Sequence, residues 1–338
     1  FDQAKALVEY GHEVIYAAID VRSFRRWRKW GYESFLKEKV QVEAMNIPCG
    51  RIPKKILHKI SEFALKNLYN WIINKYGKPD IIHSHFIETG YITIKVFKNL
   101  GIPLVHTEHY SGMNKENLSK YYYNLGLDTY KYLNEIMTVS KHLADSIRVN
   151  FGISSKVIPN IVDTSSFNYK KASNANKAFT FISVGNLLIN KRMDLLISSF
   201  YDAFKNNTSI KLYIYGEGPE RRKLERLIDN LNLQEQVFLM GLQDRKVIAK
   251  KMQESQCFVL ASRLETFGVV YIEAMAAGLP VIATQCGGPE DFVNESNGIL
   301  VSVNNQEELT KTLLKMYNES NKFDGEKISK EMVDKFSP

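Results

Sequence analysis

The sequence lacks the features that mark several common classes of protein. Its 338 residues include only three cysteines, Cys49, Cys257 and Cys286, and their spacing fits neither a zinc site nor a disulfide framework. Its longest apolar runs fall far short of the ~18 residues that a membrane-spanning helix needs. Its first residues do not have the pattern of a signal peptide. We therefore expect a cytoplasmic protein.

The composition is otherwise that of an ordinary globular protein, with 44% hydrophobic and 24% charged residues. A chain of this length can form two domains with full cores. The formal net charge is +8, and one stretch carries it. Residues 22–60 hold eleven Lys and Arg against three Glu, whereas the other 34 basic and 34 acidic residues cancel.

Within that stretch, residues 22–32 interleave basic and aromatic side chains, in the order Arg-Ser-Phe-Arg-Arg-Trp-Arg-Lys-Trp-Gly-Tyr. This pattern suits an anionic membrane surface or a nucleic acid. The structural alternative is a solvated face whose aromatic rings pack on the domain. We favour the membrane, which predicts a peripheral protein on the inner face of the membrane, and we expect no nucleic acid partner.

The first 167 residues are predicted to form an α/β domain. Residues 1–11 indicate a helix that ends at Gly11, followed by a strand over 13–18. A doubly wound domain begins with a strand and a glycine-rich turn before such a helix. Neither is present, so we expect the sequence to be incomplete at its N-terminus. A further helix, with a basic and an apolar face, is predicted over 52–76.

Three short buried strands follow, each with polar residues at its carboxyl end. They end near His85, His109 and Ser140. In open α/β sheets, ligands lie beyond the carboxyl ends of the strands. A single histidine at such a place is usually structural, but three polar strand ends together predict a cleft.

A polar linker is predicted over 168–177, and the second domain over 168–325 alternates strand and helix six times. Short apolar strands that alternate with helices predict a parallel sheet covered on both faces. The strands are expected at 179–184, 210–215, 237–240, 257–261, 280–284 and 298–303. The helices are expected at 191–204, 219–231, 244–253, 268–277, 288–294 and 305–318. Residues 326–338 begin one more helix, which we expect to be cut short.

The most informative stretch runs from residue 257 to residue 281. An apolar strand leads through a polar loop into a helix that is apolar nearly all round, and yet Glu273 lies inside that helix. A buried carboxylate is unfavourable by several kcal/mol unless it is paired. The N–H groups of Phe267 and Gly268 lie at the helix start, where the helix dipole favours an anion. We predict a phosphate there, with Glu265 and Glu273 on either side of it holding hydroxyl groups, as in a nucleotide-sugar site. The structural alternative is a glutamate that caps local amides.

Four loops of the second domain follow strand ends and are expected to converge. They carry Gly185 to Arg192, Gly216 to Pro219, Glu265 to Gly268, and Gln285 to Gly288. Their glycines allow a backbone to approach a ligand closely. The chain has no D-x-D motif of the kind that holds a divalent metal. We therefore expect no metal, and a departing diphosphate stabilised by a cationic loop and a helix N-terminus.

The pattern E-x-F-G-x-x-x-x-E-A-M-A-x-G-x-P-V-I-A, followed by Gly287-Gly288, resembles the E-x7-E signature of the GT4 family of retaining glycosyltransferases. The resemblance extends over nearly the whole chain. It implies the GT-B fold, in which two doubly wound Rossmann-like domains face a cleft. It also implies that the first domain binds the acceptor and the second binds the nucleotide sugar, with retention of the anomeric configuration.

The resemblance also assigns residues, by matching positions of this sequence. Catalytic roles fall to His109, Glu265 and Lys191, and acceptor binding falls to His85 and His109. The donor is implied to lie against Gly185, Asn186, Lys191, Arg192, Gly216, Gly218, Phe267, Gly268 and Glu273. The chain departs from the family at two of these positions. Asn186 stands where the family has a diphosphate-binding Arg, and Arg192 stands where it usually has Gly and is expected to substitute.

The sequence thus predicts a retaining, metal-independent glycosyltransferase with a UDP- or GDP-sugar as co-substrate and no cofactor. The expected acceptor is a glycan or a lipid-linked glycan of surface polysaccharide biosynthesis. One alternative is an NAD-dependent enzyme, although Gly216-Glu-Gly-Pro lacks the third glycine of the dinucleotide motif. Another is a non-catalytic nucleotide- or sugar-binding module. A glycosidase would use paired carboxylates but no phosphate site.

Overall fold

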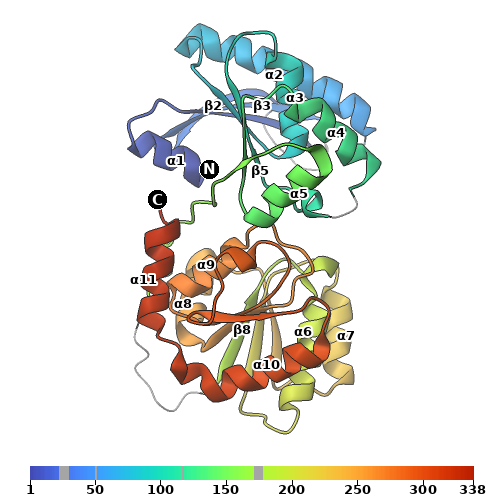
Figure 1. Ribbon diagram of the computed structural model, residues 1–338, viewed down its shortest axis with the longest axis vertical. Helices are drawn as coiled ribbons and strands as arrows, with labels where there is room; N and C mark the ends of the chain where they lie inside the picture. The colour runs from blue at the N-terminus through green and yellow to red at the C-terminus, as the bar shows by residue number, and fades with distance from the viewer. Residues whose placement is uncertain (23–29, 50–51, 116–117, 171–177) are drawn as a thin grey trace. The chain divides into compact units, whose positions relative to one another are not determined.

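The computed structural model of the protein describes residues 1–22, 30–49, 52–115, 118–170 and 178–338. The chain forms two compact units (Figure 1). The N-terminal unit comprises Phe1–Val139 and Leu143–Ile158, and the C-terminal unit comprises Ser140–His142 and Pro159–Ser337. Residues 171–177 of the predicted linker lie outside the described residues, as do residues 23–29 of the basic and aromatic stretch.

The C-terminal unit is built on a six-stranded sheet in the order β10-β9-β8-β11-β12-β13. Every pairing within it is parallel. In chain order this is the 3-2-1-4-5-6 arrangement of a doubly wound fold. The strands are β8 (Thr180–Val184), β9 (Lys211–Tyr215), β10 (Val237–Gly241), β11 (Cys257–Leu260), β12 (Val281–Thr284) and β13 (Gly298–Val301). All six lie within a few residues of the predicted ranges, and the predicted parallel sheet is confirmed.

Helices cover this sheet on both faces. Helix α6 packs against α10, whereas α9 packs against α8 and α11 (Figure 1). The helices are α6 (Met193–Phe204), α7 (Arg221–Asn230), α8 (Arg245–Glu254), α9 (Val269–Ala276), α10 (Gln306–Glu319) and α11 (Gly325–Phe336). Strands β11 and β12 are buried at every residue, which explains why they read as unbroken apolar runs in the sequence.

The helix predicted over 288–294 is wrong, because only the 3₁₀ turn η3 (Pro289–Asp291) forms there. Side-chain amides take the place of helical hydrogen bonds just beyond it. The Asn297 side chain donates to the carbonyl of Phe292 and accepts from the N–H of Asn294, at 3.0 and 2.8 Å. Asparagine side chains compete with helices in this way.

The N-terminal unit contains two sheets, in the orders β1-β3-β2 and β4-β5-β6-β7. The strands are β1 (Ile15–Arg22), β2 (Gly31–Lys37), β3 (Val40–Pro48), β4 (Ile82–His85), β5 (Leu104–Glu108), β6 (Glu135–Thr138) and β7 (Lys156–Val157). The helices are α1 (Asp2–Glu9), α2 (Lys54–Tyr76), α3 (Ile87–Phe97), α4 (Lys120–Tyr130) and α5 (Lys141–Phe151), and η1 (Ser111–Asn114) is a 3₁₀ turn.

Strands β2 and β3 form an antiparallel hairpin that the sequence analysis missed. The turn consists of Glu38 and Lys39, both with positive φ, at 47° and 67°. Two-residue hairpin turns of this kind favour Asn-Gly or Asp-Gly, and Glu-Lys does not carry that signal. The charge of residues 22–60 is the feature that stands out in the sequence, and it does not reveal the β-structure.

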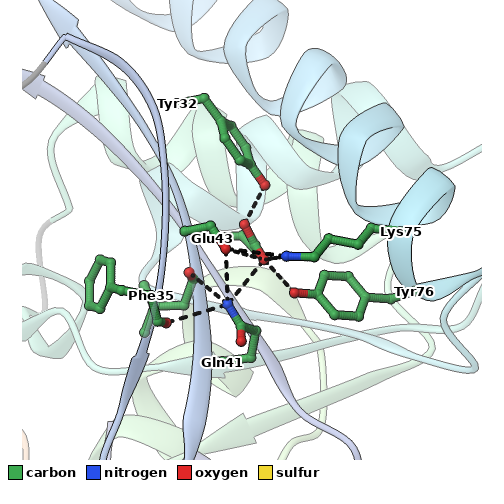
Figure 2. A network of polar contacts seen from close by, with 8 residues as sticks. Tyr32, Phe35, Gln41, Glu43, Lys75 and Tyr76 are labelled. Carbon is green, nitrogen blue, oxygen red and sulfur yellow. Dashed lines mark hydrogen bonds and ion pairs between the residues drawn. The ribbon is translucent and has the colours of Figure 1, made fainter.

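The hairpin and helix α2 are joined by a buried carboxylate, Glu43 of β3 (Figure 2). It accepts hydrogen bonds from Ser34, Gln41, Lys75 and Tyr76, at 2.9, 3.1, 3.2 and 2.6 Å. It also accepts one from the hydroxyl of Tyr32. Donors from β2, β3 and the last turn of α2 therefore converge on one fully buried group.

These contacts decide the charge state of Glu43. Burial raises its pKa, but the hydrogen bonds from Tyr32, Tyr76, Ser34 and Lys75 outweigh burial, so the net pKa lies below the ordinary value of 4.5. Burial, together with Glu43, raises the pKa of the Tyr32 phenol as well. Tyr32 is thus committed to the fold and is not part of an exposed aromatic patch.

Helix α2 carries a second surface, which faces away from the core. Its side chains Ile56, Phe63 and Trp71 are 49%, 69% and 48% exposed, and Lys55, Lys59 and Lys66 are exposed among them. Within the described residues, no helix is both long and apolar enough to cross a membrane.

We expect Glu43→Gln to destabilise the N-terminal unit by about 1–3 kcal/mol, because its donors lose a charged partner. All three tryptophans of the chain lie between residues 27 and 71, so tryptophan fluorescence during urea unfolding reports on this unit. The loss should be largest above pH 4.5. It should shrink as the pH falls through the lowered pKa of Glu43, where the wild-type carboxylate becomes protonated.

The matched control is Glu38→Gln in the same hairpin. Glu38 pairs with Lys5 at 2.7 Å on the surface, and such pairs contribute ~0–1 kcal/mol. Equal losses for the two variants, or a loss for Glu43→Gln that does not depend on pH, would contradict this role of Glu43.

Candidate active site

The site is positioned by the topology of the C-terminal sheet. Strands β8 and β11 are neighbours, and the strand order reverses between them, so the loops that follow them open a crevice at the carboxyl edge. The loop after β8 carries Lys191, and the loop after β11 carries Glu265. A backbone hydrogen bond of 2.8 Å, from the N–H of Arg263 to the carbonyl of Asn190, joins the two loops.

Lys191 and Glu265 form an ion pair across this crevice. The Lys191 ammonium donates to Glu265 Oε1 at 2.5 Å, and the Ser262 hydroxyl donates to the same oxygen at 2.7 Å. Both charged side chains are largely buried. The backbone of Glu265 is held by the loop after β12, through its N–H to Cys286 and its carbonyl to Gly288, at 3.0 and 3.1 Å. The structure thus brings together two residues that are 74 positions apart.

The glycines after β9 serve the packing of loops against one another. A Cβ atom on Gly216 would lie 2.0 Å from the carbonyl oxygen of Gly185, and one on Gly218 would lie 2.4 Å from that of Leu187. Hydrogen bonds of 2.9 Å join Gly185 to Tyr215 and Leu187 to Glu217. The close approach at these glycines is therefore to the loop after β8, and the close approach to a ligand that the sequence suggested stays a prediction.

Helix α9 begins at this edge with Gly268 as its N-cap, at a φ of 96°. Among the described residues, none provides a side-chain hydrogen bond to that cap, so the helix start presents backbone N–H groups and a positive dipole end. The ring of Phe267 is buried against Phe292 and Phe336. Phe267 can therefore offer a ligand its backbone N–H but not its side chain.

Glu273 lies further along α9, and its side chain is 15% exposed. The guanidinium of Arg245, at the start of α8, donates to Glu273 Oε1 from both Nε and Nη2, at 3.0 and 2.7 Å. The predicted need for a partner is thus met by a residue that the sequence analysis did not single out. Arg245 is 28 positions away, on another helix, and no local pattern connects the two.

The cationic loop after β8 is paired with acids. Arg192 donates to both carboxylate oxygens of Asp194, at 3.0 and 3.3 Å, and to the side-chain oxygen of Asn304. Asn186 is exposed in the same loop. That Arg192 substitutes for the arginine missing at position 186 stays a prediction.

In the N-terminal unit, the predicted histidines meet at the carboxyl edge of the second sheet. His85 Nδ1 and His109 Nε2 are hydrogen-bonded at 3.0 Å, and their rings are stacked with centroids 5.2 Å apart. The ring of His83 stacks on that of His85, with centroids 4.3 Å apart. Strands β4 and β5 are neighbours in parallel register, which is why their ends bring these side chains together.

The buried carboxylate Glu108 holds the segment that carries His109. It accepts from the backbone N–H groups of His109 and Tyr110, at 3.0 and 2.9 Å, and from the hydroxyl of Tyr130 at 3.0 Å. Burial raises its pKa, but hydrogen bonds and the neighbouring His106 outweigh burial and lower it. Glu108 was not predicted as a functional residue, and it acts through the backbone beside His109.

Desolvation keeps the histidine pair neutral. Burial, with smaller contributions from neighbouring imidazoles, lowers the pKa of His85 to about 3. For His109, burial lowers the pKa to about 4, although Glu108 opposes the shift. At neutral pH each ring therefore offers one N–H donor and one acceptor rather than a charge. Over the described ranges, these histidines included, no three His, Cys, Asp or Glu side chains gather where they could hold a metal ion.

Solved structures share this architecture. The sucrose-phosphate synthase of Thermosynechococcus elongatus superposes with a TM-score of 0.82 at 19% identity, over 99% of this chain and 87% of that one. HepE of Anabaena, solved with UDP, superposes with a TM-score of 0.72 at 18% identity, over 89% and 83%. The fold is that of the GT-B glycosyltransferases.

Family comparison gives the identity. Residues 1–166 match Glycosyltransferase Family 4, and residues 165–331 match Glycosyl transferases group 1. The chain belongs to this GT4 family of glycosyltransferases, and family membership decides against the NAD-dependent alternative.

Among curated sequences, two uncharacterized glycosyltransferases of Methanocaldococcus jannaschii are similar to it. One is 32% identical over 176 residues, 48% of this chain and 43% of that protein. The other is 29% identical over 302 residues, 83% of this chain and 81% of that protein. The alpha-monoglucosyldiacylglycerol synthase of Acholeplasma laidlawii is 25% identical over 299 residues, 80% and 74%. The chain thus spans less than half of the first of these relatives.

We expect the neutral histidine pair to make the N-terminal unit sensitive to acid. Between about pH 6.5 and pH 4 the unfolded chain binds protons that the folded His85 and His109 exclude, so stability falls as the pH falls. At pH 5 each imidazole should contribute roughly 1–2 kcal/mol to this loss. Urea unfolding of wild type and of His85→Asn/His109→Asn, followed by tryptophan fluorescence, measures it.

The double variant should have a shallower decline between pH 7.5 and pH 5 than wild type. At pH 7.5 both states are neutral at these positions, so the difference there reports packing alone. Parallel declines for the two proteins would show that the histidines titrate normally.

Proposed function

We propose that the protein transfers a sugar from a nucleotide-sugar donor to an acceptor hydroxyl, with retention of configuration and without a metal ion. The observation that carries this proposal is the ion pair of Lys191 and Glu265 beside the uncapped start of α9. An ammonium group and aligned N–H groups at one crevice suit a diphosphate. The absence of a D-x-D motif from the sequence fits the same chemistry.

The transfer places negative charge on the departing diphosphate. The bond between the anomeric carbon and the phosphate oxygen breaks as the acceptor oxygen bonds to that carbon on the same face. The acceptor proton passes to the departing phosphate oxygen, so no separate base is needed. Lys191 and the N–H groups of Phe267 and Gly268 stabilise the developing charge, and such electrostatic stabilisation is the usual source of large rate enhancements.

The other residues bind and orient the substrates. Glu265 accepts from hydroxyls of the donor sugar, and Glu273 accepts from the nucleotide ribose. In the N-terminal unit, we assign a catalytic role to His109, which is neutral at physiological pH, and acceptor binding to His85 and His109. Arg192 remains the candidate for a second cation at the diphosphate.

We propose a UDP- or GDP-sugar as the donor, and the UDP bound to HepE favours uridine. A glycan or lipid-linked glycan is the proposed acceptor, because the name of a similar Campylobacter jejuni protein, an N-acetylgalactosaminyltransferase 33% identical over 187 residues, gives a sugar linked to diphospho-undecaprenol. Thermal shifts with UDP-, GDP- and ADP-sugars would rank the donors, since a ligand that binds the native state raises its stability.

We further propose that the N-terminal unit docks on anionic membrane. Residues 23–29 of the predicted patch lie outside the described residues, but Trp30 is 65% exposed. Tyr32 belongs to the fold, but its contact with Trp71, at 4.3 Å between ring centroids, places the exposed α2 surface beside the start of β2. The exposed aromatic and lysine side chains of that α2 surface have a chemistry that suits an acidic lipid surface.

Replacing Lys191 with Met should lower kcat/KM for UDP-sugar turnover by about 10²-fold or more, as loss of one charge-stabilising donor does in other enzymes. Release of UDP in the presence of polyprenyl-diphosphate-linked glycans measures the rate. Lys205→Met, which removes an exposed charge after α6, is the matched control and should be neutral. Activity should persist in EDTA. Loss of activity in EDTA that Mn²⁺ or Mg²⁺ restores would contradict the metal-free mechanism, and wild type without turnover of any donor would favour the non-catalytic module.

Replacing Arg25, Arg26 and Arg28 with Ser should abolish sedimentation with phosphatidylglycerol vesicles, since each basic residue contributes ~1 kcal/mol at such a surface. The control replaces Arg222, Lys246 and Lys250, exposed on the C-terminal unit, with Ser. It removes the same charge and should leave vesicle binding intact. If wild type ignores these vesicles at low salt, where attraction is least screened, the membrane proposal fails.

A further inference from the structure

Arg245 forms its ion pair with a residue of another helix, unlike Arg221 of the preceding helix α7. Arg221 pairs with Glu217 and Glu225 one turn away on either side. Arg245 instead reaches from α8 to Glu273 on α9. It directs two N–H groups, Nε and Nη2, to a single oxygen, Oε1. A guanidinium that directs two N–H groups to one oxygen holds that oxygen at a defined place beside α8 and keeps the carboxylate ionised.

The guanidinium itself is fixed from the other side. Its Nη2 donates to the backbone carbonyl of Asp163 at 2.6 Å, and its Nη1 lies 3.7 Å from the Asp163 carboxylate. It also lies over the ring of Phe167, 5.1 Å from the centroid, and Phe167 is fully buried. A backbone carbonyl and a buried ring therefore hold the Arg245 guanidinium in place independently of its contact with Glu273.

Stability alone is a weak explanation for this arrangement. The Arg245 side chain is 44% exposed, and exposed ion pairs contribute only ~0–1 kcal/mol. The Glu273 carboxylate, by contrast, lies on an otherwise apolar helix whose neighbours Ile272 and Ala274 are buried. The most direct effect of these contacts is to hold Glu273 Oε1 in one position.

We infer that Arg245 is a positioning residue, which holds the Glu273 carboxylate in the orientation that accepts the ribose hydroxyls of the nucleotide. This inference rests on the proposed function, in which Glu273 binds the ribose. Arg245 does not touch the substrate in this scheme and acts through Glu273. Its removal should weaken only the part of nucleotide affinity that depends on the ribose hydroxyls.

The test compares UDP with 2′,3′-dideoxy-UDP by titration calorimetry, with GDP and its dideoxy analogue as a second pair. Wild type should prefer the ribonucleotide by about tenfold, the effect of one or two hydrogen bonds to a charged group. Glu273→Ala should lose this preference. Arg245→Gln should reduce it below about threefold and leave affinity for the dideoxy analogue unchanged. Arg245→Lys, which keeps the charge but not the fork, should lie between Gln and wild type.

The control is Lys246→Gln, the next residue of the same helix, which is exposed and removes the same charge. It should keep the wild-type preference. The inference is overturned if Arg245→Gln keeps that preference, or if it weakens both analogues equally, as a merely structural role would.

The outcomes also separate this inference from the proposed function. Wild type that binds neither UDP nor GDP would sink both. Wild type that prefers the ribonucleotide, loses the preference in Glu273→Ala and retains it in Arg245→Gln would leave the proposed function standing and remove only the role of Arg245.

Discussion

The contact of 2.5 Å between Lys191 and Glu265 requires most of the architecture of the C-terminal unit. It needs β8 and β11 as neighbours in the sheet, and it needs the chain to leave them in opposite directions. It also needs the loop after β9 to pack closely against the loop after β8. Gly216 and Gly218 allow this packing, because a side chain at either position would collide with the backbone of the loop after β8. The uncapped start of α9, three residues beyond Glu265, completes the crevice.

Four carboxylates in the protein solve the same physical problem with different partners. Glu43 is satisfied by hydroxyl, amide and lysine donors of the fold, and Glu108 by backbone amides and Tyr130. These two carboxylates are fully buried, and each is enclosed by several donors of the fold. Glu265 and Glu273 are instead paired with single cations and lie partly exposed at the edge of the sheet. A carboxylate that is partly exposed and paired with one cation can accept from a ligand, whether or not it keeps that cation, whereas one enclosed by several donors serves the fold.

The sequence predicted what depends on local pattern. Apolar runs placed the six strands of the C-terminal sheet within a few residues, and the E-x7-E pattern pointed to the family that the comparisons show. The roles of Glu265 and Glu273 stay predictions. The pairing of Glu273 with Arg245 was out of reach, because it joins two helices and a loop that only the folded sheet brings together. The β2–β3 hairpin was missed because its Glu-Lys turn adopts positive φ without the residues that signal it. That His85 and His109 lie at one sheet edge was predictable, but their direct hydrogen bond depends on the parallel register of β4 and β5.

The cations of the site are paired with carboxylates, and this reduces the attraction that a donor diphosphate would gain from them. Lys191, Arg192 and Arg245 each contact a carboxylate, so the crevice carries little net charge from its side chains. A diphosphate that reaches Lys191 therefore gains only the difference between its own attraction and that of Glu265. A group with two negative charges outweighs one carboxylate at equal distance, so under the proposed function we expect the ammonium to turn toward the diphosphate. We then expect Glu265 to exchange its cation for the hydroxyl groups of the proposed donor sugar. Without the donor, Lys191 and Glu265 neutralise each other in a largely buried place. An unpaired charge there would be unfavourable by several kcal/mol.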